Sequence, residues 1–208
     1  MRGGRSTWVF LIGTIILANV LWFVTFYLTI GVFWVKISIS TSLLTAISLL
    51  LMPERREQLH IDLKSVLIGL ASAVILYGIF WVGKEISSLI FPFAEQQIGG
   101  VYAKGEGSRM GIVFLLLFFV TGPGEELYWR GYIQDRLMKR FGGLGGFLIT
   151  VALYAGVHLW SFNFMLIGAA AVAGAFWGIM YWRLGNLVPV IISHSVWSAF
   201  IFAVIPLS

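Results

Sequence analysis

Hydrophobic residues in this chain form long unbroken runs, separated by short segments rich in glycine, proline and charge. A helix of about 20 apolar residues crosses a hydrocarbon core of roughly 30 Å, and lipid leaves only helices and closed barrels with satisfied backbone groups. The runs are continuous and do not alternate with polar residues, as the strands of a barrel would. We therefore expect an all-α, polytopic bundle of about seven transmembrane helices, with six to eight compatible with the pattern.

The runs also set the approximate bounds of the helices. They predict spans at about residues 8–30, 33–52, 61–89, 110–121, 147–160, 164–182 and 187–207. The fourth and fifth are short, and the amphipathic piece at residues 124–141 is expected to continue the fourth helix. Residues 52–58, 141–146 and 183–189 read as turns, and residues 92–109 as a mobile external loop. In the sixth span Ala170, Gly174 and Gly178 fall four apart, which predicts close packing against another helix.

The composition agrees with a membrane protein. Of the 208 residues, 59% are hydrophobic and 11% charged, and the mean hydropathy is +0.93. We expect one membrane-embedded domain over residues 1–208, with its motif-bearing half at about residues 110–207. The absence of cysteine excludes disulfides, thiolate metal sites and a cysteine nucleophile.

Lysine and arginine near the span ends predict how the chain is threaded, because these residues favour the cytoplasmic side. With the N-terminus inside, one side carries Arg2, Arg5, Arg55, Arg56, Lys64, Arg136, Lys139, Arg140 and Arg183. The other side carries Lys104 and Arg109, and three cations stay in or near spans: Lys36, Lys84 and Arg130. We therefore expect a multi-pass protein of the cell membrane, with a cytoplasmic N-terminus and an external C-terminus. The net charge of +5 then reflects topology and attraction to the lipid bilayer, and no nucleic-acid partner is expected.

Four ionisable residues lie in apolar surroundings: Glu125, Glu126, His158 and His194. Such groups are costly at membrane depth, so each one is a candidate for function. A lone histidine in an apolar helix is usually a hydrogen-bonded core residue. Two histidines in separate helices, together with a pair of glutamates in a third, favour a shared site.

The two glutamates are expected to have different roles. Pro123 suits the first turn of a new helix segment, where the helix dipole and free N–H groups would stabilise a carboxylate. Adjacent helical residues point about 100° apart, so the two carboxylates cannot serve one neighbour equally. Glu126 and Arg130, at i and i+4, suit a helical ion pair, which leaves Glu125 to face the site.

Two further pairs share helix faces, Tyr154 with His158 and His194 with Ser198. Together with Glu125 they could activate a water molecule and bind the oxyanion formed when it attacks a carbonyl. That chemistry is amide hydrolysis without a covalent intermediate. Ser195 and Ser198 are weaker candidates as nucleophiles, because no Gly-x-Ser-x-Gly motif surrounds them.

A metal site is the alternative use of the same side chains. Glu125, His158 and His194 have the composition of a catalytic zinc set with one open position. The chain has no His-Glu-x-x-His motif, so the ligands would come from three separate helices. We favour a site without a cofactor and keep a divalent metal, zinc, as the alternative.

The segments EELYWR (Glu125 to Arg130), YAGVH (Tyr154 to His158) and HSVWS (His194 to Ser198) resemble, in this order, three motifs of the CPBP family. This group of intramembrane proteases includes prenyl-protein (CAAX) endopeptidases and bacteriocin-processing or immunity-type members. The Glu-Glu-x-x-x-Arg motif is matched in full. Tyr154 replaces the usual phenylalanine of Phe-x-x-x-His, and Ser198 departs from the asparagine of His-x-x-x-Asn. The resemblance covers roughly residues 110–207.

The resemblance implies a water-accessible cavity in the membrane and cleavage of a membrane-associated peptide or protein. It implies that Glu125 is the general base and that His158 and His194 position water or stabilise the oxyanion. Arg130 would support the helix. Because Ser198 replaces the asparagine that helps to hold the oxyanion, the missing donor would come from Asn163 or His194.

Two other functions remain open from the sequence. One is a catalytically inactive immunity or scaffold protein, which the serine at position 198 motivates. The other is a small proton-coupled transporter with a relay through Glu125, His158 and His194. The transporter is disfavoured because the chain shows no inverted repeat.

Overall fold

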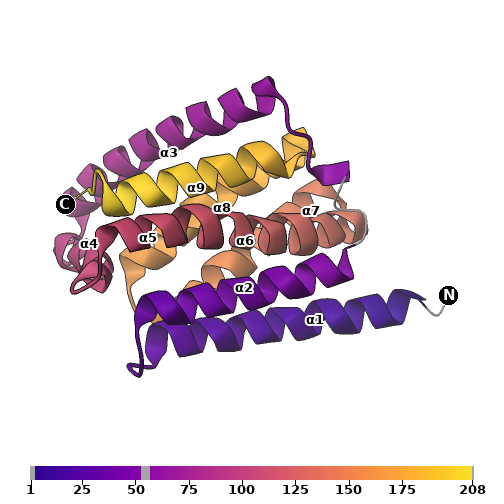
Figure 1. Ribbon diagram of the computed structural model, residues 1–208, viewed down its shortest axis with the longest axis horizontal. Coiled ribbons are helices and arrows are strands. Elements are labelled where there is room, and N and C mark those ends of the chain that lie inside the picture. The colour runs from indigo at the N-terminus through magenta and orange to yellow at the C-terminus, as the bar shows by residue number, and fades with distance from the viewer. Residues whose placement is uncertain (1–2, 53–56, 208) are drawn as a thin grey trace.

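The chain forms an elongated bundle of helices that run side by side (Figure 1). A computed structural model describes residues 3–52 and 57–207. This part of the chain is helical and contains no strand, which confirms the expected polytopic bundle. Arg2, Arg55 and Arg56, and most of the turn predicted at residues 52–58, lie outside the described residues.

The helices follow the predicted spans closely, with short π-helical and 3-10 segments between them. They are α1 (Gly3–Trp22), η1 (Phe23–Tyr27), α2 (Phe33–Leu51), α3 (Leu63–Ile90), α4 (Ala94–Tyr102), η3 (Ala103–Gly105), α5 (Met110–Leu116), η4 (Leu117–Thr121), α6 (Gly122–Glu126), η5 (Leu127–Gln134), α7 (Asp135–Val157), η6 (His158–Ser161), α8 (Phe164–Leu184) and α9 (Leu187–Ala203).

Five helical stretches within the described residues are long and apolar enough to cross a membrane: Trp8–Tyr27, Phe33–Leu51, Leu63–Ile90, Met110–Ser161 and Phe164–Leu184. The apolar helix Leu187–Ala203 is shorter. At most 33% of each most apolar window is buried, so these helices present many apolar side chains to their surroundings. Exposed apolar surface on this scale fits contact with lipid and a multi-pass membrane protein.

The stretch Met110–Ser161 contains both the fourth and the fifth predicted spans. Its first arm runs without a break through α5, η4, α6 and η5 into α7, which forms one row across the middle of the bundle (Figure 1). Gly142 then interrupts the helix with φ +77°, a backbone conformation that favours glycine. Beyond this turn Gly146 packs on the backbone of Met138, where no Cβ would fit. The amphipathic piece at residues 124–141 therefore continues the fourth helix, as expected.

Two glycines beside Pro123 let the central helix approach its neighbours. A Cβ at Gly122 would lie 2.6 Å from the Ser195 Oγ atom on α9, and one at Gly124 would lie 2.5 Å from the Thr41 Cγ2 atom on α2. Figure 1 shows α6 between these two helices. The Gly-Pro-Gly sequence thus places the two glutamates that follow it in the interior of the bundle.

The segment at residues 92–109, predicted as a mobile loop, is largely helical, so that prediction is wrong. Its helix α4 is fixed to the start of α8 by two hydrogen bonds of Gln97. The Gln97 carbonyl accepts from Asn163 Nδ2 at 2.7 Å, and its side-chain Oε1 accepts from the Met165 amide at 3.0 Å. These tertiary contacts outweigh the local preference of the glycines for a loop.

The small residues of α8 pack closely against α7, as their spacing predicts. A Cβ at Gly174 would lie 2.8 Å from the Tyr154 Cδ1 atom, and one at Gly178 would lie 3.0 Å from the Phe147 ring. Because these glycines have no side chains, the backbone carbonyls of Gly174 and Gly178 can also accept hydrogen bonds from side chains of the central helix. Arg130 Nη2 donates to Gly174 O at 3.0 Å, and Gln134 Nε2 donates to Gly178 O at 2.8 Å.

Candidate active site

Glu126 lies at the centre of a buried network. Its Oε1 atom accepts a hydrogen bond from Arg130 Nη1 at 2.9 Å and lies 2.7 Å from His194 Nδ1. Glu126 is 0% exposed and Arg130 1% exposed. The predicted ion pair of Glu126 and Arg130 is therefore present. His194 bonds directly to Glu126 and not to Glu125.

The contact fixes the orientation of His194. A carboxylate accepts hydrogen bonds, so Nδ1 of His194 carries the proton that points at Glu126, and Nε2 is left for another partner. The ring also stacks on Trp177, with ring centroids 3.8 Å apart and planes at 13°. Trp177 in turn donates from Nε1 to Ser193 Oγ at 3.2 Å. His194 is thus held from its edge and from its face.

Arg130 joins the central helix to α7 and α8. Besides its bonds to Glu126 and to the carbonyl of Gly174, its guanidinium lies 4.6 Å from the centre of the Tyr154 ring. A buried guanidinium needs such partners, because an unpaired one would be strongly destabilising. These contacts support the predicted structural role of Arg130.

Glu125 has a separate set of partners. Its Oε2 atom accepts from the Tyr154 hydroxyl at 2.8 Å, and the residue keeps 8% of its surface exposed. The angle between adjacent helical positions thus separates the two carboxylates, as predicted. We name Glu125, Tyr154, His158 and Trp22 the Glu125 cluster, and Glu126, Arg130, His194 and Trp177 the Glu126 cluster.

His158 joins the Glu125 cluster through Tyr154. Its Nδ1 donates to the Tyr154 carbonyl at 2.8 Å, and the two rings are 5.1 Å apart. Since Nδ1 is the donor, Nε2 is the acceptor, and Trp22 Nε1 points at it at 3.4 Å. Trp22 lies on α1 and is fully buried. Sequence reasoning missed this residue, because a tryptophan in an apolar span carries no signal of a partner 136 residues away in the sequence.

The helix that carries the glutamates does not begin where it was expected to begin. Thr121 and Gly122 have helical dihedral angles, so α6 continues η4 without free N–H groups at its start. The expected stabilisation of the carboxylates by a helix N-terminus is therefore wrong. Pro123 does lie in the first turn of α6, and π-helical segments flank this turn on both sides. Such segments are frequent at functional sites.

Ser198 and Asn163 are both engaged with backbone groups. Ser198 Oγ donates to the carbonyl of His194 at 2.8 Å, one turn earlier on the same helix face. Asn163 caps α8, because its Oδ1 accepts from the Leu166 amide at 2.9 Å while its Nδ2 donates to Gln97. The proposal of Asn163 as an oxyanion donor does not agree with these contacts. Ser195 is buried, and its hydroxyl has no partner among the described residues.

Each of the three residues of the zinc alternative bonds to another partner. Glu125 bonds to Tyr154, His194 bonds to Glu126, and His158 bonds to backbone and Trp22. Over residues 3–52 and 57–207, no group of three His, Cys, Asp or Glu side chains could hold a metal ion. The geometry of these residues thus does not fit the expected ligand set.

Comparison with known proteins agrees with the three motifs. The family model of type II CAAX prenyl endopeptidases, Rce1-like, matches residues 108–200. The matched segment contains Glu125, His158 and His194, which confirms the resemblance stated from the sequence. No curated protein and no solved structure matches the chain. At the level of the family, the match supports an intramembrane endopeptidase of the CAAX type.

Proposed function

We propose that this chain, Rce1-like over residues 108–200, is an intramembrane endopeptidase that uses Glu125 to activate water. The observation that carries the proposal is the separation of the two buried glutamates. Glu126 is engaged by Arg130 and His194, whereas Glu125 bonds to one phenol and keeps part of its surface accessible. A carboxylate must be accessible to act as a general base.

In the proposed reaction the Tyr154 hydroxyl holds Oε2 of Glu125, and Oε1 takes a proton from a water molecule. The oxygen of that water attacks the carbonyl carbon of the peptide, and the carbonyl π electrons move to its oxygen. When the tetrahedral intermediate collapses, the C–N bond breaks and the nitrogen leaves with the proton that Glu125 accepted. The products are a carboxylic acid and an amine.

The two histidines have different roles in this proposal. Nε2 of His158 is an acceptor whose partner is Trp22 Nε1 at 3.4 Å, and in this proposal the attacking water takes the place of Trp22 at that nitrogen. Nε2 of His194 is the nitrogen that Glu126 leaves available, and in the protonated form it donates to the oxyanion. A donor placed before the reaction stabilises developing charge strongly in a dry site.

The substrate is a membrane-associated peptide or protein, because the two clusters lie inside a bundle of apolar helices. We further propose that the N-terminus faces the cytoplasm and the C-terminus faces outward. The uneven distribution of lysine and arginine in the sequence supports this orientation.

A catalytically inactive immunity or scaffold protein is the second candidate. It is favoured by Ser198, whose hydroxyl donates to a helix carbonyl, whereas the related motif has an asparagine at this position. In this alternative the same buried contacts stabilise the bundle without turnover.

A comparison of peptides in cells separates the two candidates. Cells that express the unmutated chain are compared with cells that express Glu125→Gln, and membrane fractions are searched for a peptide that accumulates in the variant. We expect at least one such substrate and expect the purified unmutated chain to cleave it. If no peptide differs and no purified preparation cleaves a broad membrane-peptide library, the scaffold function is correct.

The metal alternative is tested on the same cleavage reaction. Activity that survives a strong chelator, in protein without zinc by elemental analysis, agrees with glutamate acting alone. Activity that disappears with the chelator and returns with zinc would contradict the cofactor-free proposal.

A further inference from the structure

An apolar cavity lies beside the candidate active site, where Ser198 on α9 lines it. It has a volume of about 450 Å³ and opens between α3, α4, α8 and α9. This volume is in the range of small-molecule pockets in proteins, about 300 to 1,000 Å³. Neither Glu125 nor His158 lines the cavity, so the proposed hydrolysis does not account for it.

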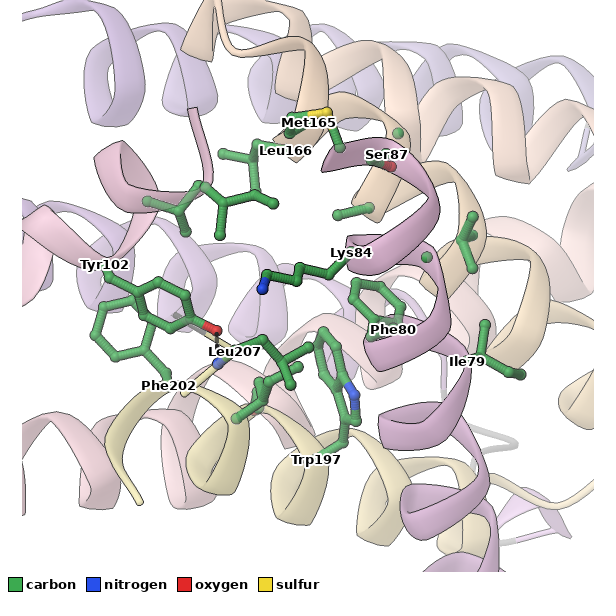
Figure 2. Close-up of a pocket in the computed structure, with 18 of the residues that line it drawn as sticks. Ile79, Phe80, Lys84, Ser87, Tyr102, Met165, Leu166, Trp197, Phe202 and Leu207 are labelled. Atoms are coloured by element: carbon green, nitrogen blue, oxygen red, sulfur yellow. Dashed lines mark hydrogen bonds between the residues drawn. The ribbon is translucent and has the colours of Figure 1, made fainter. Parts of the chain in front are cut away.

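Three of the polar residues that line the cavity lie near the ends of their helices. Lys84 and Ser87 lie near the end of α3, and Tyr102 lies at the end of α4. Figure 2 shows the Lys84 side chain extending from α3 into the cavity toward Tyr102 and Leu207. The Tyr102 oxygen accepts from the Leu207 amide at 3.0 Å, and burial raises the pKa of this phenol. Tyr102 therefore keeps its own proton, which it can donate to a ligand.

The rest of the cavity is apolar and reaches toward the middle of the bundle. Ile79 precedes Lys84 by five residues, or about 7.5 Å along the helix axis. Ile79 is 41% exposed and Val172 on α8 is 45% exposed, so these walls continue into the outer apolar face of the bundle. In a membrane this face meets hydrocarbon, and the cavity is open to acyl chains.

Lys84 has one carboxylate partner among the described residues. Its Nζ atom lies 3.3 Å from Glu85 Oε1, and the two side chains are 24% and 51% exposed. An ion pair of neighbouring, partly exposed side chains contributes little to stability. A phosphate can therefore replace or share this contact at low cost.

We propose that the cavity binds one anionic membrane phospholipid. Its phosphate contacts Lys84 and the Tyr102 hydroxyl, and one acyl chain lies along Ile79 and Val172. The order of polar and apolar groups along α3 matches that of a lipid that enters from the bilayer, with its headgroup near the end of the bundle. The cation selects the headgroup charge, and the apolar walls hold the chain.

The proposed lipid would lie next to the third motif. Ser198 and Trp197 line the cavity, and Ser198 bonds to the carbonyl of His194. An acyl chain in the cavity would therefore contact the helix face that carries His194. The lipid site goes beyond the proposed hydrolysis and does not depend on it.

The charge part of the proposal is tested by native mass spectrometry of the purified full chain, with dioleoyl phosphatidylglycerol and dioleoyl phosphatidylcholine as probes. We expect the chain to retain one molecule of phosphatidylglycerol more tightly than phosphatidylcholine. We expect Lys84→Gln to weaken the affinity for phosphatidylglycerol about fivefold, as the loss of one lysine contact predicts. Glu85→Gln should retain it at least as well as the unmutated chain.

Lys104→Gln is the matched control for charge. Lys104 lies at the same end of the bundle, but it contacts the rings of Phe26 and Phe33 and does not line the cavity. This variant should leave the retention of phosphatidylglycerol unchanged. An equal loss for Lys84→Gln and Lys104→Gln would show only general attraction to the surface and would overturn the proposal.

The steric part is tested by filling the cavity. Gly168 lines it, and a Cβ there meets no atom within 4 Å, so Gly168→Leu narrows the cavity without a clash at the backbone. We expect this variant to lose both lipids, whereas Gly78→Leu, at an open position outside the cavity, should keep both. Retention by Gly168→Leu equal to that of the unmutated chain would contradict the lipid site.

A third outcome identifies a different occupant. If Gly168→Leu stops the cleavage of a peptide substrate and leaves lipid retention unchanged, the cavity binds the substrate and the lipid proposal is wrong. Each variant is first checked for monodispersity and thermal unfolding, and Ala169→Phe replaces Gly168→Leu if the latter does not fold, because Ala169 also lines the cavity.

Discussion

Glu125 and Glu126 are neighbours in the sequence, yet their carboxylates bond to different helices. Glu125 accepts from Tyr154 on α7, whereas Glu126 contacts His194 on α9 and Arg130 on its own helix. The two acids therefore differ in what they can do. One is a buried structural partner, and the other is proposed to act on water.

The stability of the bundle should depend on Glu126 far more than on a similar pair at the surface. Glu126→Gln removes a charge that Arg130 and His194 share in the interior, so we expect a loss of about 3 kcal/mol in the free energy of unfolding. Lys139→Gln is the control, because Lys139 and Asp135 form an ion pair of the same i,i+4 spacing with a lysine that is 63% exposed. That change should cost at most about 1 kcal/mol. Unfolding in mixed detergent micelles measures the free energy of unfolding of both variants. Equal losses in Glu126→Gln and Lys139→Gln would contradict the central role of Glu126.

The position of Gly174 should not tolerate a side chain, whereas that of Gly168 on the same helix should tolerate one. A Cβ at Gly174 would lie 2.8 Å from Tyr154 and 3.7 Å from Arg130 Nη2, so Gly174→Ala is expected to cost about 1 to 3 kcal/mol. A Cβ at Gly168 meets no atom within 4 Å, and alanine there should be neutral or stabilising by up to about 1 kcal/mol. Thermal unfolding of the two variants checks the difference. A stable Gly174→Ala protein would mean that α7 and α8 do not approach closely at this point.

Ser198→Asn restores the residue found in the related motif. The serine hydroxyl donates to the carbonyl of His194, while an asparagine amide would reach farther from α9 and could donate to the oxyanion. We expect turnover about tenfold faster, which corresponds to roughly 1.4 kcal/mol. The prediction is checked by measuring kcat of the unmutated chain and of Ser198→Asn on the same peptide. An unchanged kcat would show that the oxyanion donor lies elsewhere.

The membrane orientation can be measured directly, because the chain contains no cysteine. Glu106 and Lys139 are exposed at opposite ends of the first arm of Met110–Ser161. In intact cells an impermeant thiol reagent should label Glu106→Cys and should reach Lys139→Cys only after the membrane is opened. The reverse pattern would contradict a cytoplasmic N-terminus.

Contacts within one helix could be predicted from the sequence. The ion pair of Glu126 and Arg130, the bond of His158 to the carbonyl of Tyr154 and the bond of Ser198 to that of His194 all join residues four apart. Helical periodicity places such residues on one face. Apolar runs predicted the spans for the same reason, since length and composition alone decide whether a helix crosses lipid.

Contacts between helices could not be predicted in the same way. The hydrogen-bond partner of His194 is Glu126 and not Glu125, and this choice depends on how the central helix packs against α9. The contact of Trp22 with His158 joins positions 136 apart in the sequence. Neither of these two packing contacts leaves a local pattern in the residues.

The turnover of Glu125→Gln tests the central claim most directly. The glutamine amide keeps the size of the side chain and can still accept from Tyr154, but it cannot take a proton from water. On a peptide that the unmutated chain cleaves, we expect kcat to fall about 10² to 10⁴-fold with unchanged thermal unfolding. A kcat within twofold of the unmutated protein would show that Glu125 is not the general base.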